Sequence, residues 1–169
     1  RELDLSMVEM RQVTLEVVEA LGAERKRLGA SIRVGLLPRV YGDRTSLAEI
    51  MTQLLDNSLR YLAPGRNGKI EVFHQEKWGR TYFHVRDNGR GIPEDQRAKV
   101  FRIFGRGGLP DTPGDGMGLV YVRTLIHRHG GRIWYESRSE EGTIFSFVLG
   151  DPEPTQTDFS SSDSEDGRK

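Results

Sequence analysis

Apolar residues recur along the chain with two different periods, one typical of helices and one typical of strands. Val8, Leu15, Val18 and Leu21 follow roughly helical spacing with charged residues between them, which predicts an amphipathic helix near the start of the chain. The same pattern, ended by breaking residues, predicts three helices over residues 6–28, 45–62 and 117–129.

Shorter runs of alternating or β-branched apolar residues lie between the predicted helices and indicate strands. These runs cover residues 31–36, 69–77, 81–87, 132–137 and 143–149. The turn at Gly79–Arg80 joins two of them into a hairpin, and the last two form a second hairpin. We therefore predict an α+β fold, a two-layer sandwich in which three helices cover one face of a mixed, mostly antiparallel sheet.

Polar residues at the helix boundaries indicate where each helix begins. Ser6 is a plausible N-cap for the first helix. At the second helix, Ser46 and Glu49 have the spacing of a capping box, and Asp43 is a rival N-cap. The sequence alone leaves these two possibilities open.

Two stretches of the chain do not fit a regular element. Residues 88–116 contain seven glycines and three prolines, and connections of this length inside a compact domain are usually functional. From residue 151 onward the chain is acidic, rich in serine and nearly free of apolar residues. We expect one domain over residues 1–150 and a disordered tail over residues 151–169, whose simplest role is solubility and whose serines are candidates for phosphorylation.

The composition excludes several classes of function. The 169 residues have a formal net charge of zero, so no basic excess points to a nucleic acid. The absence of cysteine excludes disulfides and thiolate metal sites and fits the cytoplasm, and the four histidines are scattered. No apolar run is long enough to span or contact a membrane, and no signal-peptide pattern opens the chain. Because the first residue is Arg1, we expect a piece of a longer protein.

A row of polar side chains runs along one face of the second predicted helix. Gln53, Asn57, Arg60 and Tyr61 are spaced by three or four residues, which stacks them on that face. A carboxamide oxygen suits Mg²⁺, and an arginine one turn later suits a phosphate. The simpler interpretation of this row alone is a solvated helix face.

Two glycine-rich motifs add further candidate chemistry. In DNGRGI, residues 87–92, Asp87 follows a strand, and a carboxylate there could accept a hydrogen bond from an exocyclic amine such as adenine N6. In GDGMGL, residues 114–119, glycines lead into a helix N-terminus, where free N–H groups favour an anion. Each motif alone is weak, because a turn explains the first and the second lacks the lysine of a phosphate-binding loop.

Taken in order, these motifs resemble the ATP-binding catalytic domain of sensor histidine kinases, within the GHKL ATPase superfamily. LLDNSLRY is similar to the family's N box, DNGRGI to its first glycine box, VFRIFGRG to its F box, GDGMGL to its second glycine box and EGT to its last motif. The resemblance covers residues 3 to about 149, and the stretch from Gly114 to Ser137 is especially similar to phytochrome-like and other soluble-sensor kinases.

The resemblance implies a Bergerat-type fold that binds ATP and Mg²⁺ under a mobile lid, residues 102–116. Asn57 would hold Mg²⁺, Arg60 and the lid residue Arg106 would contact phosphate, and Asp87 would bind adenine N6. Further positions implied to line or support the nucleotide site are Gln53, Tyr61, Gly89, Gly91, Ile92, Phe104, Gly114, Gly116, Met117, Gly118, Leu119 and Thr143, with Phe101 and Phe104 anchoring the lid.

Two departures from the family pattern affect the expected activity. Gln53 stands where kinases of this class commonly have asparagine and hydrolysing relatives have glutamate, and a glutamine cannot take a proton from water. None of the four histidines is followed by an acidic residue, as the phospho-acceptor histidine of the family is. We therefore expect the chain to supply the γ-phosphate of ATP to a histidine on a separate dimerisation and phospho-acceptor helical domain, from which it passes to a response-regulator receiver domain.

Two other functions fit the same sequence. The chain could be a pseudokinase that acts as a nucleotide-binding scaffold, which Gln53 would explain. It could also be a serine kinase of the anti-sigma type, which shares the fold.

Overall fold

The computed structural model describes residues 2–101 and 118–150. Five strands form one mixed sheet in the order β2-β4-β5-β7-β6, and a separate two-stranded sheet pairs β1 with β3. The helices are α1 (Met10–Ala20), α2 (Gly22–Leu28), α3 (Arg44–Arg60) and α4 (Gly118–Arg128), with a 3-10 helix at Glu94–Lys99. The strands are β1 (Leu5–Val8), β2 (Ser31–Val34), β3 (Val40–Asp43), β4 (Lys69–Lys77), β5 (Arg80–Asp87), β6 (Arg132–Arg138) and β7 (Gly142–Val148).

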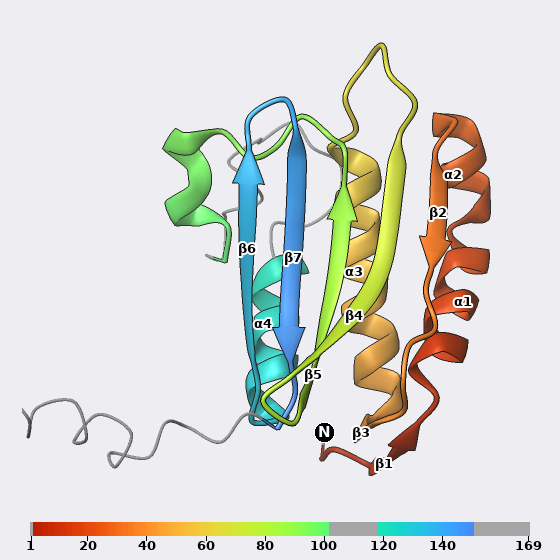
Figure 1. Cartoon of the computed structure of the whole chain (residues 1–169), viewed down its shortest axis with the longest axis vertical. Helices are drawn as coiled ribbons and strands as arrows, with labels where there is room; N and C mark the ends of the chain where they lie inside the picture. The colour runs from red at the N-terminus through yellow and green to blue at the C-terminus, as the bar shows by residue number, and fades with distance from the viewer. Residues whose placement is uncertain (1, 102–117, 151–169) are drawn as a thin grey trace, which may run out of the picture.

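The helices lie on one face of the five-stranded sheet, as the sequence predicts (Figure 1). Strand β2 pairs parallel to β4, and every other neighbouring pair in this sheet is antiparallel. Both predicted hairpins are present, β4–β5 and β6–β7, and β7 lies between β5 and β6. The prediction of a two-layer α+β sandwich is therefore confirmed.

The prediction of a single helix over residues 6–28 is wrong in two respects, because the helix begins later and is divided into two. Residues 5–8 form strand β1, which pairs antiparallel with β3, and Ser6 lies in that strand opposite Gly42. The helix begins at Met10 after Glu9, whose side chain makes no capping hydrogen bond, and it breaks between Ala20 and Gly22. The apolar spacing misplaced this boundary because the pairing partner of β1 lies more than 30 residues away in sequence.

The N-cap of α3 is Asp43. Its carboxylate accepts a hydrogen bond from the Ser46 N–H at 2.9 Å, and its other oxygen accepts one from the Asp4 N–H at 3.1 Å. Asp43 therefore fulfils the role that the Ser46–Glu49 capping box would have taken, and Glu49 instead accepts a hydrogen bond from the Tyr121 hydroxyl of α4 at 2.9 Å.

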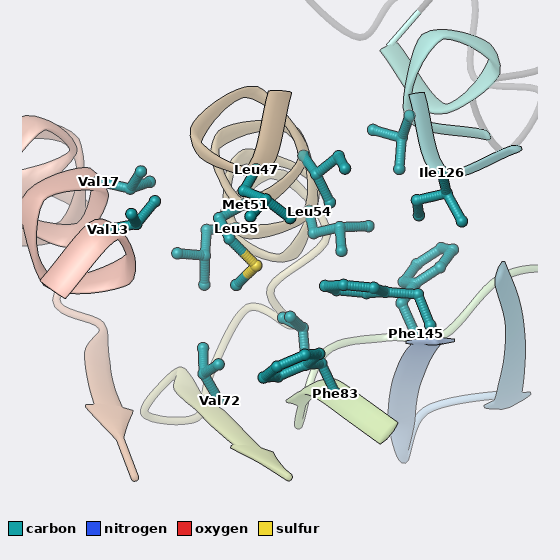
Figure 2. Close-up of a cluster of buried hydrophobic side chains, with 14 of the residues drawn as sticks. Val13, Val17, Leu47, Met51, Leu54, Leu55, Val72, Phe83, Ile126 and Phe145 are labelled. Carbon is teal, nitrogen blue, oxygen red and sulfur yellow. The ribbon is translucent and has the colours of Figure 1, made fainter. Parts of the chain in front are cut away.

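The hydrophobic core lies between α3 and the sheet, with α1 and α4 on either side of α3 (Figure 2). Buried side chains from every one of these elements meet there, including Val13, Val17, Leu47, Met51, Leu54, Leu55, Val72, Phe83, Ile126 and Phe145. Within β5, Phe83 and Val85 belong to the core. Because side chains alternate across a strand, Asp87 lies on the same helix-facing side at the end of β5.

The cap of α3 can be tested by changing Asp43. Asp43→Ala should lower the free energy of unfolding by about 1–2 kcal/mol, because the Ser46 and Asp4 N–H groups lose their acceptor. Urea denaturation measures the change. Asp43→Asn is the matched control, since its amide oxygen still caps the helix and should lose less. Equal stability of the alanine and parent proteins would show that this cap does not support α3.

Candidate functional site

The carboxylate of Asp87 is the centre of the candidate site. Asp87 is only 5% exposed at the end of β5. The Gly89 N–H donates to its Oδ1 at 2.9 Å, and the Thr143 N–H donates to the same oxygen at 3.3 Å. Both hydrogen bonds that the described residues make to this carboxylate fall on Oδ1, which makes Oδ2 the candidate acceptor for a ligand.

Burial raises the pKa of Asp87 above its ordinary value. The Gly89 N–H, the nearby Ser58 hydroxyl and the Thr143 N–H each oppose that rise. The Ser58 hydroxyl is buried and lies close enough to lower the pKa, although its geometry does not meet that of a hydrogen bond. Dipoles alone therefore stabilise the charged form of this carboxylate, because no cation among the described residues contributes.

The end of α3 packs directly on the loop that follows Asp87. The Arg90 N–H donates to the Tyr61 carbonyl at 3.0 Å, and the Arg90 guanidinium lies 5.3 Å from the centre of the Tyr61 ring. A Cβ on Gly89 would lie 2.3 Å from the Tyr61 carbonyl oxygen. Gly91 has φ +75°, and a Cβ there would lie 2.4 Å from the Arg138 carbonyl oxygen. Both glycines are therefore required by the close approach of backbone segments.

Asn57 lies on α3 next to Ser58, the residue that influences Asp87. It is 5% exposed, and its carboxamide has no hydrogen-bond partner in the described part of the chain. An amide oxygen is a suitable ligand for Mg²⁺, which usually keeps waters and substrate phosphates as its other ligands. No group of three or more histidine, aspartate or glutamate residues among residues 2–101 and 118–150 could hold a metal by itself. The Asn57 carboxamide oxygen therefore fits Mg²⁺ as one oxygen ligand among several.

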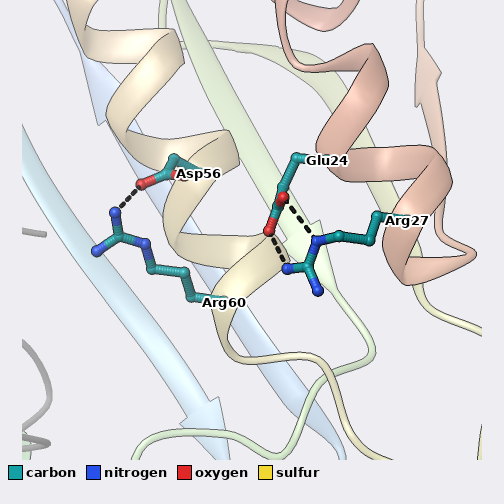
Figure 3. Close-up of polar contacts among 4 residues, drawn as sticks. All are labelled: Glu24, Arg27, Asp56 and Arg60. Carbon is teal, nitrogen blue, oxygen red and sulfur yellow. Dashed lines mark hydrogen bonds and ion pairs between the residues drawn. The ribbon is translucent and has the colours of Figure 1, made fainter. Parts of the chain in front are cut away.

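Arg60 lies one turn beyond Asn57 and has a spare donor. Its Nη2 pairs with the Asp56 carboxylate at 2.9 Å, and both side chains are about three-quarters buried, with exposures of 23% and 26% (Figure 3). Its Nη1 is buried without a hydrogen-bond partner among the described residues. By contrast, the exposed Arg27 on α2 uses two nitrogens on Glu24 (Figure 3). An arginine held by one carboxylate with one donor left over is suited to bind a phosphate oxygen.

Among the other predicted site residues, Ile92 and Thr143 both hydrogen-bond to Ser137. The Ile92 N–H donates to the Ser137 hydroxyl at 2.7 Å, and that hydroxyl also pairs with the Thr143 hydroxyl at 2.9 Å. Gln53 lies half-buried on α3, one turn before Asn57. Phe101 packs on the rings of Tyr135 and Phe145.

The part of the candidate site that the sequence predicts to bind phosphate is only partly described. Gly118 begins α4, and Leu119 is buried in the core. Phe104, Arg106, Gly114, Gly116, Met117 and the predicted lid lie outside the described residues.

Two residues near the site were missed by the sequence analysis. Ser58 is hidden within the N-box motif, where nothing distinguishes it from an ordinary core position. Arg66 lies in the loop before β4 and donates to the carbonyls of Asn88 at 2.8 Å, Gly89 at 2.7 Å and Glu140 at 2.7 Å. Neither leaves a signal in a single sequence, because both act on segments that they meet only in the folded chain.

Comparisons with known proteins show the family to which this chain belongs. The family model for histidine kinase-, DNA gyrase B- and HSP90-like ATPases matches residues 42–153. The methanogenesis regulatory histidine kinase FilI of Methanothrix harundinacea is 43% identical over 137 residues, which are 79% of this chain and 15% of FilI. Cyanobacterial phytochrome B of Nostoc is 36% identical over 155 residues, which are 88% of this chain and 20% of that protein.

A solved structure shows the same fold. The histidine kinase ThkA, in complex with the response regulator protein TrrA, matches with a TM-score of 0.68 and 25% identity, over 86% of this chain and 41% of the ThkA chain.

The fold, the buried Asp87 and these matches define a nucleotide-binding domain of the GHKL class. The chain belongs to the family of histidine kinase-, DNA gyrase B- and HSP90-like ATPases and is a catalytic domain of the histidine kinase type. It spans no more than a fifth of the length of the two curated relatives. None of its described helices has the length and apolar character needed to cross a bilayer.

The raised pKa of Asp87 predicts how stability responds to Asp87→Asn. A carboxyl whose pKa is higher in the folded state than in the unfolded chain lowers stability as the pH rises above its unfolded-state pKa. The loss is complete once the pH has passed its folded-state pKa. Asp87→Asn removes the charge but keeps an oxygen for the Gly89 and Thr143 N–H groups. Urea denaturation should show the variant gaining stability relative to the parent as the pH rises from below 3.8 to neutrality.

The same variant should lose the nucleotide. Its new NH₂ group would face the adenine amine, so affinity for an ATP analogue should fall by about tenfold or more in calorimetry. An Asp87→Asn protein that is less stable at neutral pH and binds the analogue normally would contradict the assignment of this carboxylate.

Proposed function

We propose that this domain binds ATP with Mg²⁺ and supplies the γ-phosphate to a histidine on a separate dimerisation and phospho-acceptor domain. The proposal is supported mainly by Asp87, a buried carboxylate whose Oδ1 accepts two N–H groups and whose Oδ2 is left for a ligand. A buried acceptor of this kind is costly unless a donor meets it. The N6 amine of adenine is a donor that suits it.

The two ends of the site perform different tasks. Asp87 Oδ2 accepts from the base and sets its orientation, while the Asn57 carboxamide oxygen and Arg60 Nη1 lie on α3 toward the phosphates. Mg²⁺, when bound to the triphosphate, neutralises charge that develops during transfer. Positioning and charge stabilisation supply most of the rate in such reactions, so the chain needs no covalent intermediate of its own.

Gln53 favours transfer over hydrolysis. It lies one turn before Asn57, where a carboxylate would be placed to take a proton from an attacking water. A carboxamide cannot take that proton, but it can still offer an oxygen to the metal or to water. The domain is therefore suited to hold ATP until another nucleophile arrives.

The histidines of this chain are poorly placed to be that nucleophile. His84 is buried and pairs with the Ser146 hydroxyl at 2.6 Å, and burial lowers its pKa. The His129 ring accepts from the Asp43 N–H at 3.0 Å and donates to the Leu125 carbonyl at 2.7 Å. His74 lies in β4 and His127 on the outer side of α4. An acceptor on another domain explains the site better.

We propose that the phosphate then passes to a response-regulator receiver domain. Support comes from the ThkA match, because that histidine kinase was solved in complex with a response regulator.

Asn57→Ala tests the proposed role of the metal. The variant should bind a Mg²⁺-loaded ATP analogue about tenfold more weakly or worse, because the ion loses its protein ligand. Affinity for adenosine, which carries no metal, should not change. Calorimetry with both ligands measures the two effects. Leu62→Ala, at a half-buried position just beyond α3, is a control for general loosening and should not separate the two ligands.

Phosphotransfer is tested by adding a dimerisation and phospho-acceptor domain from a related histidine kinase together with ATP. Acid-labile phosphate on that domain is the expected product. Acid-stable phosphate would instead indicate a serine kinase of the anti-sigma type. Nucleotide binding without any transfer to several such domains would favour a scaffold.

A further inference from the structure

Arg66 ties together two loops that are distant in sequence and that both adjoin Asp87. Its Nε donates to the Asn88 carbonyl at 2.8 Å, and its Nη2 donates to the carbonyls of Gly89 and Glu140 at 2.7 Å each. The first two carbonyls belong to the loop that follows β5, and the third belongs to the turn between β6 and β7. One guanidinium therefore joins the loop that contains the Gly89 N–H donor to the turn that precedes Thr143, the other N–H donor to the Asp87 carboxylate.

The rest of the Arg66 loop strengthens this connection. The Asn88 carboxamide accepts from the Lys69 N–H at 2.8 Å and donates to the Asn67 carbonyl at 2.9 Å. The Asn88 N–H donates to the Lys69 carbonyl at 3.1 Å. The Glu140 N–H donates to the Arg90 carbonyl at 2.8 Å. The residues after Asp87 are thus held from two sides, with Arg66 as the side chain that contacts both.

A chain of contacts connects Arg66 to the Asp87 carboxylate, whose Oδ2 would bind a base. Arg66 holds the carbonyls on either side of the Gly89 amide, and the Gly89 N–H donates to Asp87 Oδ1 at 2.9 Å. The orientation of the 88–89 peptide therefore decides which carboxylate oxygen is occupied and which faces a ligand. Tight packing of Gly89 on the Tyr61 carbonyl leaves little room for that peptide to settle elsewhere once the arginine holds it.

We propose that Arg66 is a positioning residue for nucleotide recognition, which fixes the Asn88–Gly89 peptide so that Asp87 presents Oδ2 to the base. The proposal rests on the proposed function, since it assigns Arg66 a role in the ATP site. Arg66 does not touch the nucleotide in this account, and it acts through Gly89. Its planar fork reaches three carbonyls at once, which a lysine cannot reproduce because its single nitrogen is a point charge.

A purely structural role for Arg66 would give a different result in a binding experiment. The contacts to the Asn88 and Glu140 carbonyls are exposed and the contact to the Gly89 carbonyl is part-buried, so water can replace much of what the arginine provides and much of the stability should remain after Arg66→Ala. What water cannot replace is the fixed orientation of the peptide. A looser Gly89 N–H would stabilise the Asp87 carboxylate less, and its pKa would rise further.

A higher pKa of Asp87 would change how the affinity for nucleotide depends on pH. Protonated Asp87 would carry its proton on Oδ2, because Oδ1 already accepts two N–H groups, and that proton would oppose the adenine amine. The groups that face this carboxyl are the Ser58 hydroxyl of α3, the Gly89 N–H and the Thr143 N–H of β7, and none of these titrates near neutrality. A shift in the acid side of the binding profile therefore reports on the Gly89 contact.

The experiment compares four proteins, each the whole 169-residue chain: the parent, Arg66→Ala, Arg66→Lys and Arg25→Ala. Arg25 is a matched control, because its Nη1 donates to the Ala30 carbonyl at 3.1 Å in a connection that does not adjoin Asp87. Calorimetry measures the affinity of each for a Mg²⁺-loaded, non-hydrolysable ATP analogue from neutral pH downward, and thermal unfolding measures stability.

Arg66→Ala should bind roughly fivefold more weakly than the parent at neutral pH, and its affinity should begin to fall at a higher pH. Arg66→Lys should recover part of the loss, and Arg25→Ala should match the parent in affinity and pH profile. The proposal is overturned if Arg66→Ala keeps the parent's affinity and profile, or if Arg25→Ala loses as much for the same loss of stability. A parent protein that binds no nucleotide would instead refute the proposed function.

Discussion

A single buried carboxylate, that of Asp87, connects the parts of this domain that form its candidate site. It lies at the end of β5 on the side of the sheet that the helices cover, and it is held by N–H groups from the following loop and from β7. A charged group in such a place is unfavourable unless dipoles or a ligand compensate for lost water. The sequence around it, two glycines that follow and a glycine before Thr143, allows backbone to approach closely enough to provide those dipoles.

The proposed site has a base end and a phosphate end, and different elements of the fold support each. The base end is built from β5, β7 and the surrounding loops, and Arg66 connects these loops through backbone carbonyls. The proposed phosphate end depends on α3, where, among the described residues, no hydrogen bond is made to the Asn57 carboxamide or to Arg60 Nη1. The hydrophobic core beneath α3 fixes the distance between the two ends, because the same helix packs on the sheet that carries Asp87 (Figure 2). Folding and ligand recognition thus depend on the same packing.

Much of the fold could be predicted from the sequence, because its elements are locally consistent. The helix of Arg44–Arg60 and both hairpins have clear periodicity and turn residues, and their existence is confirmed. The boundary at β1 could not be predicted, since its strand exists only through pairing with β3. The 3-10 helix at Glu94–Lys99 lies in a segment that looked irregular. Strand order was also hidden, because nothing local places β7 between β5 and β6.

The candidate site also contains residues that could be predicted from the sequence and residues that could not. Asp87 and Asn57 were recognisable because their motifs resemble a known family, and their residue types match the chemistry that a nucleotide and a metal require. The partners that orient Asp87 were not recognisable. Arg66 looks like an ordinary loop arginine until the loops at Asn88 and Glu140 come together.

The proposed function depends on one contact above all, in which Oδ2 of the buried Asp87 carboxylate accepts a hydrogen bond from the N6 amine of adenine. The most direct measurement is calorimetric comparison of ATP with inosine triphosphate, both with Mg²⁺, because the two differ at the position of that amine. Inosine presents an oxygen where adenine presents N–H groups, so an acceptor would face an acceptor. The inosine nucleotide should bind at least roughly tenfold more weakly than ATP. Equal affinity for the two would contradict it, since the carboxylate at residue 87 would then contribute nothing to base recognition.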